Sequence, residues 1–172
     1  MIKNIDKQAE NVVKLLCKNH KKAASAESCT GGLISAAITS VSGSSEVFDM
    51  GICSYANEIK AEKLNVPREF LEGFGAVSEQ VAKAMAEGVM NSARSDYGVS
   101  TTGIAGPTGG TEEKPVGTVW IGVCSKEKGS RALRFLFKTD DRPKGITERE
   151  FIRHQAVLKA LELLEEEIKN TL

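Results

Sequence analysis

The side chains with the greatest capacity for chemistry gather in one short stretch near the N-terminus. It combines a carboxylate, two hydroxyls and two adjacent glycines, from Glu27, Ser28, Thr30, Gly31 and Gly32. Small residues at 23–26 precede the stretch and an apolar-periodic segment at 33–41 follows it, the layout of a strand, a loop and a helix. Glycines let a ligand approach the backbone amides, and a helix N-terminus offers unpaired N–H groups. The stretch predicts an anion site, most often for phosphate; the alternative is an ordinary turn with Ser and Thr as helix caps.

A second glycine-rich loop, which includes Gly103 and Gly106, extends over residues 103–110 and follows a predicted strand at 97–102. In open α/β sheets, ligands bind beyond the carboxyl ends of parallel strands. Because both loops follow such strands, we expect them to converge on one crevice. Two convergent loops strengthen the prediction of an anion site.

Hydrophobic periodicity predicts helices and strands that alternate along the first part of the chain. Strands are predicted at 22–26, 47–55, 97–102, 116–124 and 131–137. Helices are predicted at 5–19, 33–41, 57–64, 69–74, 78–94 and 146–168. Alternation calls for parallel strands with crossover helices, and Lys128-Gly129 favours a hairpin between the last two strands. The predicted fold is a single three-layer α/β/α domain over residues 1–172, with a mixed, mostly parallel five-stranded sheet.

Charge and hydropathy exclude several classes of partner. The 172 residues include 23 basic and 23 acidic side chains, for a formal net charge of zero. Nucleic-acid-binding proteins normally carry a basic excess, so we expect no nucleic acid, although a small phosphorylated ligand remains compatible. No apolar run reaches the length of a membrane span, and residues 1–6 do not resemble a signal peptide. We therefore expect a cytoplasmic protein without a membrane partner.

The four cysteines, Cys17, Cys29, Cys53 and Cys124, are scattered without CxxC pairs, and the chain has two histidines. This spacing predicts neither a metal site nor a disulfide framework. Cys29 is a possible nucleophile because a helix N-terminus stabilises a thiolate, although a small cysteine buried beneath the loop is the commoner outcome. Cys53 and Cys124 fall in predicted strands and are expected in the core.

Five linked motifs resemble the CinA C-terminal domain family. They are Ala26-Glu27-Ser28-Cys29-Thr30-Gly31-Gly32, Gly43-Ser44-Ser45, Tyr55-x-Asn57-x-x-Lys60, Gly75-Ala76-Val77-Ser78, and Gly103-Ile104-Ala105-Gly106-Pro107-x-Gly109-Gly110 with Lys114-Pro115-Val116-Gly117-Thr118-Val119. They occur in the right order with compatible spacings and cover nearly the whole chain. A set of five is far more specific than any single glycine loop.

The resemblance implies an amidohydrolase that converts nicotinamide mononucleotide to nicotinic acid mononucleotide and ammonia, without a metal or organic cofactor. It assigns catalysis to Ser45, Tyr55 and Lys60, and substrate binding to Thr102. It also implies a homodimer or a higher homo-oligomer.

Amide hydrolysis needs an activated nucleophile, an acid for the leaving amine and donors for the oxyanion. Ser45 and Lys60 would supply the nucleophile and its base if burial or a neighbouring cation lowers the lysine pKa. Tyr55 would relay a proton or hold the oxyanion. The structural alternative is that Ser45 caps a turn, Tyr55 packs at an edge and Lys60 is a solvated helix residue. Glu27 would either hold a ribose hydroxyl or brace the loop amides.

The family resemblance implies that an arginine close to the start of the last helix faces the substrate. Two residues of this chain match that position. Residues 137–142 resemble the start of the family motif and end in Arg142, whereas residues 148–153, with Arg149, better match its helical continuation. An insertion at 143–147 separates the two segments, so both arginines are candidates.

Two other functions compete with the amidase. One is a nucleotide-sensing domain that binds without turnover, and Ser45, Tyr55 and Lys60 together weigh against it because binding needs no nucleophile or base. The other is an interaction domain in DNA uptake or repair. The neutral charge and the lack of a basic, aromatic-rich stripe argue against direct DNA binding.

Overall fold

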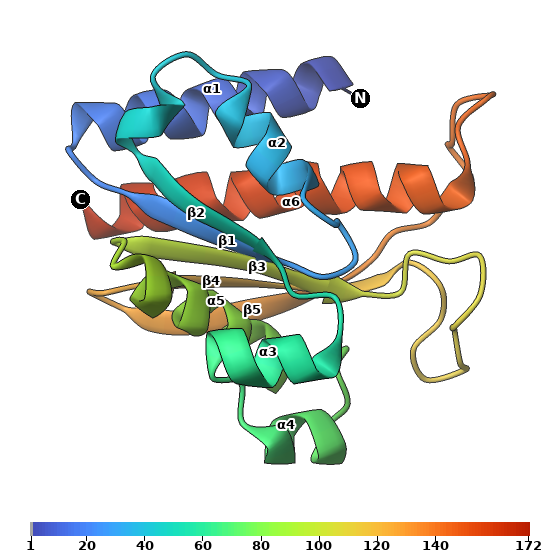
Figure 1. Ribbon diagram of the computed structural model, residues 1–172. Coiled ribbons are helices and arrows are strands. Elements are labelled where there is room, and N and C mark those ends of the chain that lie inside the picture. The colour runs from blue at the N-terminus through green and yellow to red at the C-terminus, as the bar shows by residue number, and fades with distance from the viewer. Residues whose placement is uncertain (1) are drawn as a thin grey trace.

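The computed structural model describes residues 2–172, which form a five-stranded sheet between two layers of helices (Figure 1). The strands are β1 (Ala23–Glu27), β2 (Phe48–Cys53), β3 (Tyr97–Gly103), β4 (Thr118–Ser125) and β5 (Gly129–Leu136). The helices are α1 (Ile2–Lys18), α2 (Leu33–Thr39), the 3-10 turn η1 (Ser44–Glu46), α3 (Asn57–Leu64), α4 (Arg68–Gly73), α5 (Glu79–Ala93) and α6 (Glu148–Thr171). None of these helices is long and apolar enough to cross a membrane.

The strands lie in the order β2-β1-β3-β4-β5. Strand β1 pairs in parallel with both β2 and β3, whereas β3–β4 and β4–β5 are antiparallel. Strand β4 therefore runs against the other four, which confirms the mixed, mostly parallel sheet of a three-layer α/β/α fold. Helices α1, α2 and α6 cover one face and α3, α4 and α5 lie on the other (Figure 1).

Helix α5 lies unusually close to the sheet because two glycines leave room for its backbone. A Cβ added to Gly98 of β3 would lie 2.0 Å from the carbonyl oxygen of Ala86, and one added to Gly122 of β4 would lie 2.4 Å from that of Ala82. Neither contact can be relieved by a side-chain rotation, since the obstacle is helix backbone. This close packing fixes the loop that precedes α5, which forms part of the site described below.

We expect Gly98→Ala to lower the free energy of unfolding by about 2–3 kcal/mol, because the new methyl group forces α5 off the sheet. Urea unfolding followed by circular dichroism measures the loss. Gly73→Ala is the matched control, since a Cβ at this exposed end of α4 meets nothing within 4 Å. A Gly98→Ala protein as stable as this control would contradict the close-packing interpretation.

Candidate active site

The three parallel strands β1, β2 and β3 end at the same side of the sheet, where their following loops enclose a cavity of about 220 Å³. Its lining residues are Ser28, Cys29, Tyr55, Asn57, Lys60, Ala76, Val77, Thr102, Gly103, Ala105 and Arg149. The cavity therefore lies where the sequence predicted a crevice, at the carboxyl ends of parallel strands.

The structure brings together about half of the predicted site residues. Those that line the cavity are Ser28, Tyr55, Lys60, Thr102, Gly103 and Arg149. Those outside its lining are Glu27, Thr30, Gly31, Gly32, Ser45, Gly106 and Arg142. Gly106 adjoins the cavity because its carbonyl oxygen accepts a hydrogen bond from Nη1 of Arg149, at 2.9 Å. The roles of these residues in binding and catalysis remain predictions.

Lys60 is a buried lysine, with 1% of its surface exposed. Its Nζ donates a hydrogen bond to the carbonyl oxygen of Tyr55, at 3.1 Å, and it forms no ion pair with the described residues. Burial lowers the pKa of the ammonium group below its usual value, since the charged form loses its hydration. The alternative of a solvated helix lysine is therefore excluded. A lysine of this kind becomes a base more readily than one at the surface.

Arg149 connects two of the loops around the cavity. Its Nη2 donates to the hydroxyl of Tyr55 at 3.0 Å, while its Nη1 holds the carbonyl of Gly106. This contact fixes one end of a tyrosine whose side chain is otherwise 63% exposed. The guanidinium also places a fixed positive charge beside the phenol oxygen, suited to an oxyanion or a phosphate.

Arg142, the other arginine candidate, lies outside the cavity. It is exposed in the turn before α6, where its guanidinium donates to the carbonyl of Ile146. Arg149 instead follows the N-cap residue Thr147 by two positions, in the first turn of α6, and this turn faces the cavity. The structure therefore favours Arg149 over Arg142 as the arginine that meets a ligand.

The cysteines occupy three different environments. Cys29 lines the cavity but is 5% exposed, and burial raises the pKa of its thiol to about 12. It is therefore protonated at neutral pH and a poor nucleophile, which agrees with the expected buried cysteine. Cys124 is buried as predicted. The prediction that Cys53 lies in the core is wrong, because Cys53 is exposed at the end of the edge strand β2.

The carboxylate of Glu27 is fully buried and braces the loop that follows β1. Its oxygens accept hydrogen bonds from the backbone N–H groups of Gly32, Ile34 and Ser35, at 2.9–3.0 Å. They also accept from the hydroxyls of Thr30, at 2.7 Å, and Ser35, at 2.8 Å. Of the two roles predicted for Glu27, the structure shows bracing of the loop amides.

This arrangement corrects the prediction that the same loop binds phosphate through its amides. The amides at the start of α2 already hold an anion, the carboxylate of Glu27, and a second negative charge there would be repelled. Thr30 is fully buried and its hydroxyl also bonds that of Thr101 at 2.7 Å, so it cannot reach a ligand. Gly31 and Gly32, with φ of +59° and +94°, serve the turn itself. Ser28 alone among these residues lines the cavity.

Ser45 lies in η1, at the opposite end of β2 from Tyr55 and Lys60. The six residues of β2 span about 17 Å at the usual rise per residue, so Ser45 cannot contact Lys60 within one chain. Its side chain is exposed. One chain therefore assembles two of the three predicted catalytic residues.

Sequence reasoning missed Arg153, one helical turn beyond Arg149 on α6. Its Nη2 donates to the carbonyl of Thr30 at 2.7 Å and lies 3.3 Å from where a Cβ on Gly31 would be placed. Arg153 therefore ties α6 to the loop that Glu27 braces. The spacing of four between the two arginines was the available signal, because residues i and i+4 share a helix face.

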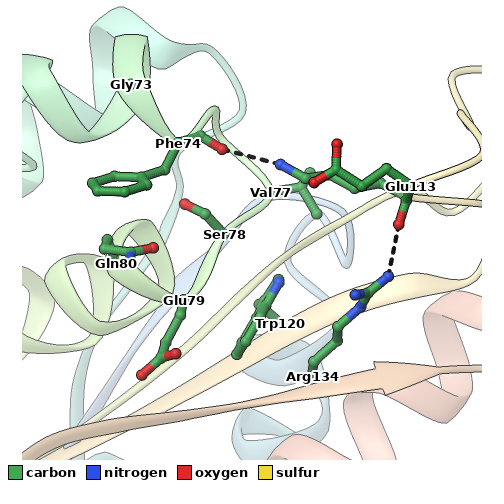
Figure 2. A pocket seen from close by; sticks show the side chains of 10 residues that line it. Gly73, Phe74, Val77, Ser78, Glu79, Gln80, Glu113, Trp120 and Arg134 are labelled. Atoms are coloured by element: carbon green, nitrogen blue, oxygen red, sulfur yellow. Dashed lines mark hydrogen bonds between the residues drawn. The ribbon is translucent and has the colours of Figure 1, made fainter.

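Figure 2 shows a second cavity, of about 440 Å³. It shares the lining residue Val77 with the first cavity. None of the predicted site residues lines it. Its cations are already engaged, because Lys114 donates to the carbonyl of Phe74 at 3.0 Å and Arg134 to that of Glu113 at 2.9 Å. Glu79 and Glu113 add acidic groups to its wall. The smaller cavity is therefore the better candidate for an active site.

We expect Glu27→Ala to lower the free energy of unfolding by about 3 kcal/mol or more, because it removes a charged acceptor and leaves one buried and two partly buried amides without their partner. Urea unfolding provides the measurement. Glu46→Ala, at an exposed residue of η1, is the control and should change stability by less than about 0.5 kcal/mol. A loss below about 1 kcal/mol for Glu27→Ala would show that the carboxylate is not the brace of this loop.

The chain is similar to proteins of known family over nearly its whole length. The family model described as the CinA C-terminal domain matches residues 5–168. A relative from Thermoanaerobacter pseudethanolicus is 48% identical over 159 residues, which cover 92% of this chain and 36% of the relative. A "CinA-like protein" of Chlorobium limicola is 53% identical over 126 residues, which cover 73% of this chain and 29% of that protein. The chain thus spans about a third of the length of these relatives.

A solved structure shares this architecture closely. The competence/damage inducible protein CihA of Agrobacterium tumefaciens superposes with a TM-score of 0.88 at 37% identity, with 96% of each chain covered. Together with the match to the family model, this likeness shows that the chain belongs to the CinA C-terminal domain family.

Proposed function

We propose that this protein hydrolyses the carboxamide of nicotinamide mononucleotide, releasing nicotinic acid mononucleotide and ammonia. The observation that best supports the proposal is Lys60, a buried amine with a lowered pKa that faces a cavity beside Tyr55 and Arg149. Burying a lysine costs stability, and perturbed amines of this kind cluster at functional sites. A domain that only bound a nucleotide would gain little from a buried lysine with a lowered pKa.

The charges around the cavity suit this substrate. The charged side chains in the described lining are the cations Lys60 and Arg149. The lowered pKa of Lys60 reduces the repulsion between its amine and the positive pyridinium ring, whereas Arg149 remains charged and attracts an anionic group. The volume of about 220 Å³ is small for a whole nucleotide, so the reacting carboxamide end is the part best suited to enter.

The chemistry that we propose proceeds in two stages. We propose that Ser45 comes from a second copy of the chain in a homodimer, because it cannot contact Lys60 within one chain. The amine of Lys60 accepts the proton of this Ser45 hydroxyl, and the serine oxygen forms a bond to the carboxamide carbon. The developing oxyanion is stabilised by the hydroxyl of Tyr55, which Arg149 positions. The C–N bond then breaks, the nitrogen takes the proton from Lys60 and leaves as ammonia, and water hydrolyses the resulting ester. No metal or organic cofactor takes part in this scheme.

The proposal is tested by incubating the purified protein with nicotinamide mononucleotide and measuring ammonia release, with mass spectrometry of the nucleotide product. We expect Lys60→Met to reduce kcat/KM by about 10²–10⁴-fold, the usual contribution of a general base. Lys63→Met, at an exposed lysine of the same helix, is the control and should retain full activity. Wild-type protein that leaves the nucleotide unchanged would refute the proposed function.

The same two variants, Lys60→Met and Lys63→Met, test whether the pKa of Lys60 is lowered, and this test needs no substrate. Because burial lowers the folded pKa below 10.5, the unfolded chain binds more protons between the two pKa values, and wild-type stability rises with pH in that window. We expect Lys60→Met to be more stable than wild type at neutral pH, with an advantage that shrinks as the pH approaches 10.5. Thermal unfolding between about pH 7 and 10, with Lys63→Met alongside, measures this difference. An advantage that grew with pH would contradict a lowered pKa.

A further inference from the structure

The inference concerns where the ribose and the phosphate of the nucleotide lie, and it rests on the proposed function. The first cavity holds about 220 Å³, enough for the carboxamide end but small for a whole nucleotide. Arg149 bonds the Tyr55 hydroxyl at that end, so a phosphate at the other end of the molecule needs different cations. The second cavity, of about 440 Å³, is the neighbouring space, and Val77 lines both.

A row of side chains leads from the first cavity into the second. Thr102 of β3 faces Trp120 of β4, and Trp120 faces Arg134 of β5. Residues that face each other on antiparallel strands point to the same side of the sheet. Thr102 lines the first cavity, whereas Trp120 and Arg134 line the second. Because neighbouring strands lie about 4.8 Å apart, the Cα atoms of Thr102 and Arg134 are about 10 Å apart, near enough for one nucleotide to occupy both cavities.

Two cations of the second cavity have only neutral partners among the described residues. Lys114 donates to the carbonyl of Phe74 and Arg134 to that of Glu113 (Figure 2). A carbonyl does not neutralise either charge. An ammonium group has three N–H groups and a guanidinium five, so both side chains retain donors for a phosphate. Lys114 also belongs to a sequence motif that contributes nothing to the lining of the first cavity.

The two acidic side chains of the same wall do not cancel these charges. Glu79 forms an ion pair with Lys83 one turn along α5, at 2.6 Å, so its charge is compensated. Glu113 is exposed, and water and salt therefore screen its repulsion of an anion. The cations around the cavity thus outnumber the acidic groups by one.

Trp120 gives the second cavity a flat apolar surface. Its indole carries one N–H donor beside a large apolar face, a combination that suits a sugar ring with hydroxyl groups. We propose that this cavity binds the ribose phosphate of the nucleotide, with Lys114 and Arg134 on the phosphate and Trp120 against the ribose. The carboxamide end then lies past Val77 in the first cavity.

Two substrates that differ only in the phosphate test this assignment. We expect Lys114→Gln and Arg134→Gln each to raise KM for nicotinamide mononucleotide about tenfold or more, without lowering kcat. Neither variant should change kcat/KM for nicotinamide riboside, which has no phosphate. Glu113→Gln should lower KM for the mononucleotide, because it removes a negative charge near the phosphate. Lys128→Gln, at an exposed lysine just before β5, is the control and should behave as wild type.

A binding measurement tests the site without turnover. Trp120 is the one tryptophan of the chain, so tryptophan fluorescence reports on this cavity. We expect ribose 5-phosphate to change the emission to saturation, whereas ribose at the same concentrations should not. Lys114→Gln should weaken this binding about tenfold or more, and Lys128→Gln should leave it unchanged. Ribose 5-phosphate should also inhibit hydrolysis of the mononucleotide competitively.

The opposite results would overturn the assignment in distinguishable ways. If Lys114→Gln and Arg134→Gln reduce kcat/KM equally for both substrates, these residues only hold their loop. An emission that ignores ribose 5-phosphate, or binding that neither variant weakens, would also overturn the site. Binding without competition would mean that the second cavity holds a separate sugar phosphate and not the substrate. Wild-type protein that binds ribose 5-phosphate at Trp120 yet leaves the mononucleotide intact would instead refute the proposed function.

Discussion

The structure around the cavity depends on one buried ion, the carboxylate of Glu27. Glu27 is the last residue of β1, and its carboxylate accepts hydrogen bonds from the N–H groups at the start of α2. One side chain therefore holds the strand, the turn and the helix together. The hydroxyl of Thr30 extends this anchor to Thr101 of β3, and Arg153 joins it from α6 through the carbonyl of Thr30. A buried charge is tolerated only when its hydrogen bonds are nearly complete, as they are here. The positive end of the α2 dipole therefore stabilises the carboxylate of Glu27. The positive charge that would attract an anionic ligand must come from other residues.

Two basic side chains line the cavity, and they differ in how firmly they hold their proton. Arg149 stays protonated in any environment and is held by the Gly106 carbonyl and the Tyr55 hydroxyl. Lys60 is buried beside a single neutral acceptor, and its pKa falls. A permanent cation and a lysine with a lowered pKa therefore share one cavity, which suits the proposed amide hydrolysis. The burial that lowers the pKa of Lys60 also destabilises the fold at neutral pH.

The architecture could be predicted from the sequence because it depends on local patterns. Helix and strand periodicity located the five strands and six α-helices within a few residues, with α3 at its observed bounds, 57–64, whereas the 3-10 turn η1 was not predicted. The roles of individual polar residues depended on long-range contacts that no local pattern encodes. Whether Arg142 or Arg149 met the cavity was decided by where α6 begins, and the carboxylate of Glu27 could be assigned to the loop amides only once the turn was built. Cys53 was misplaced because an apolar strand pattern does not distinguish an edge strand from a central one.

The separation of Ser45 from Lys60 follows from the geometry of parallel sheets rather than from a detail of this chain. Residues that follow parallel strands meet at the carboxyl edge, so Ser28, Tyr55 and Thr102 converge although they are far apart in sequence. A residue that precedes a strand lies at the other edge, however close it is in sequence to the site.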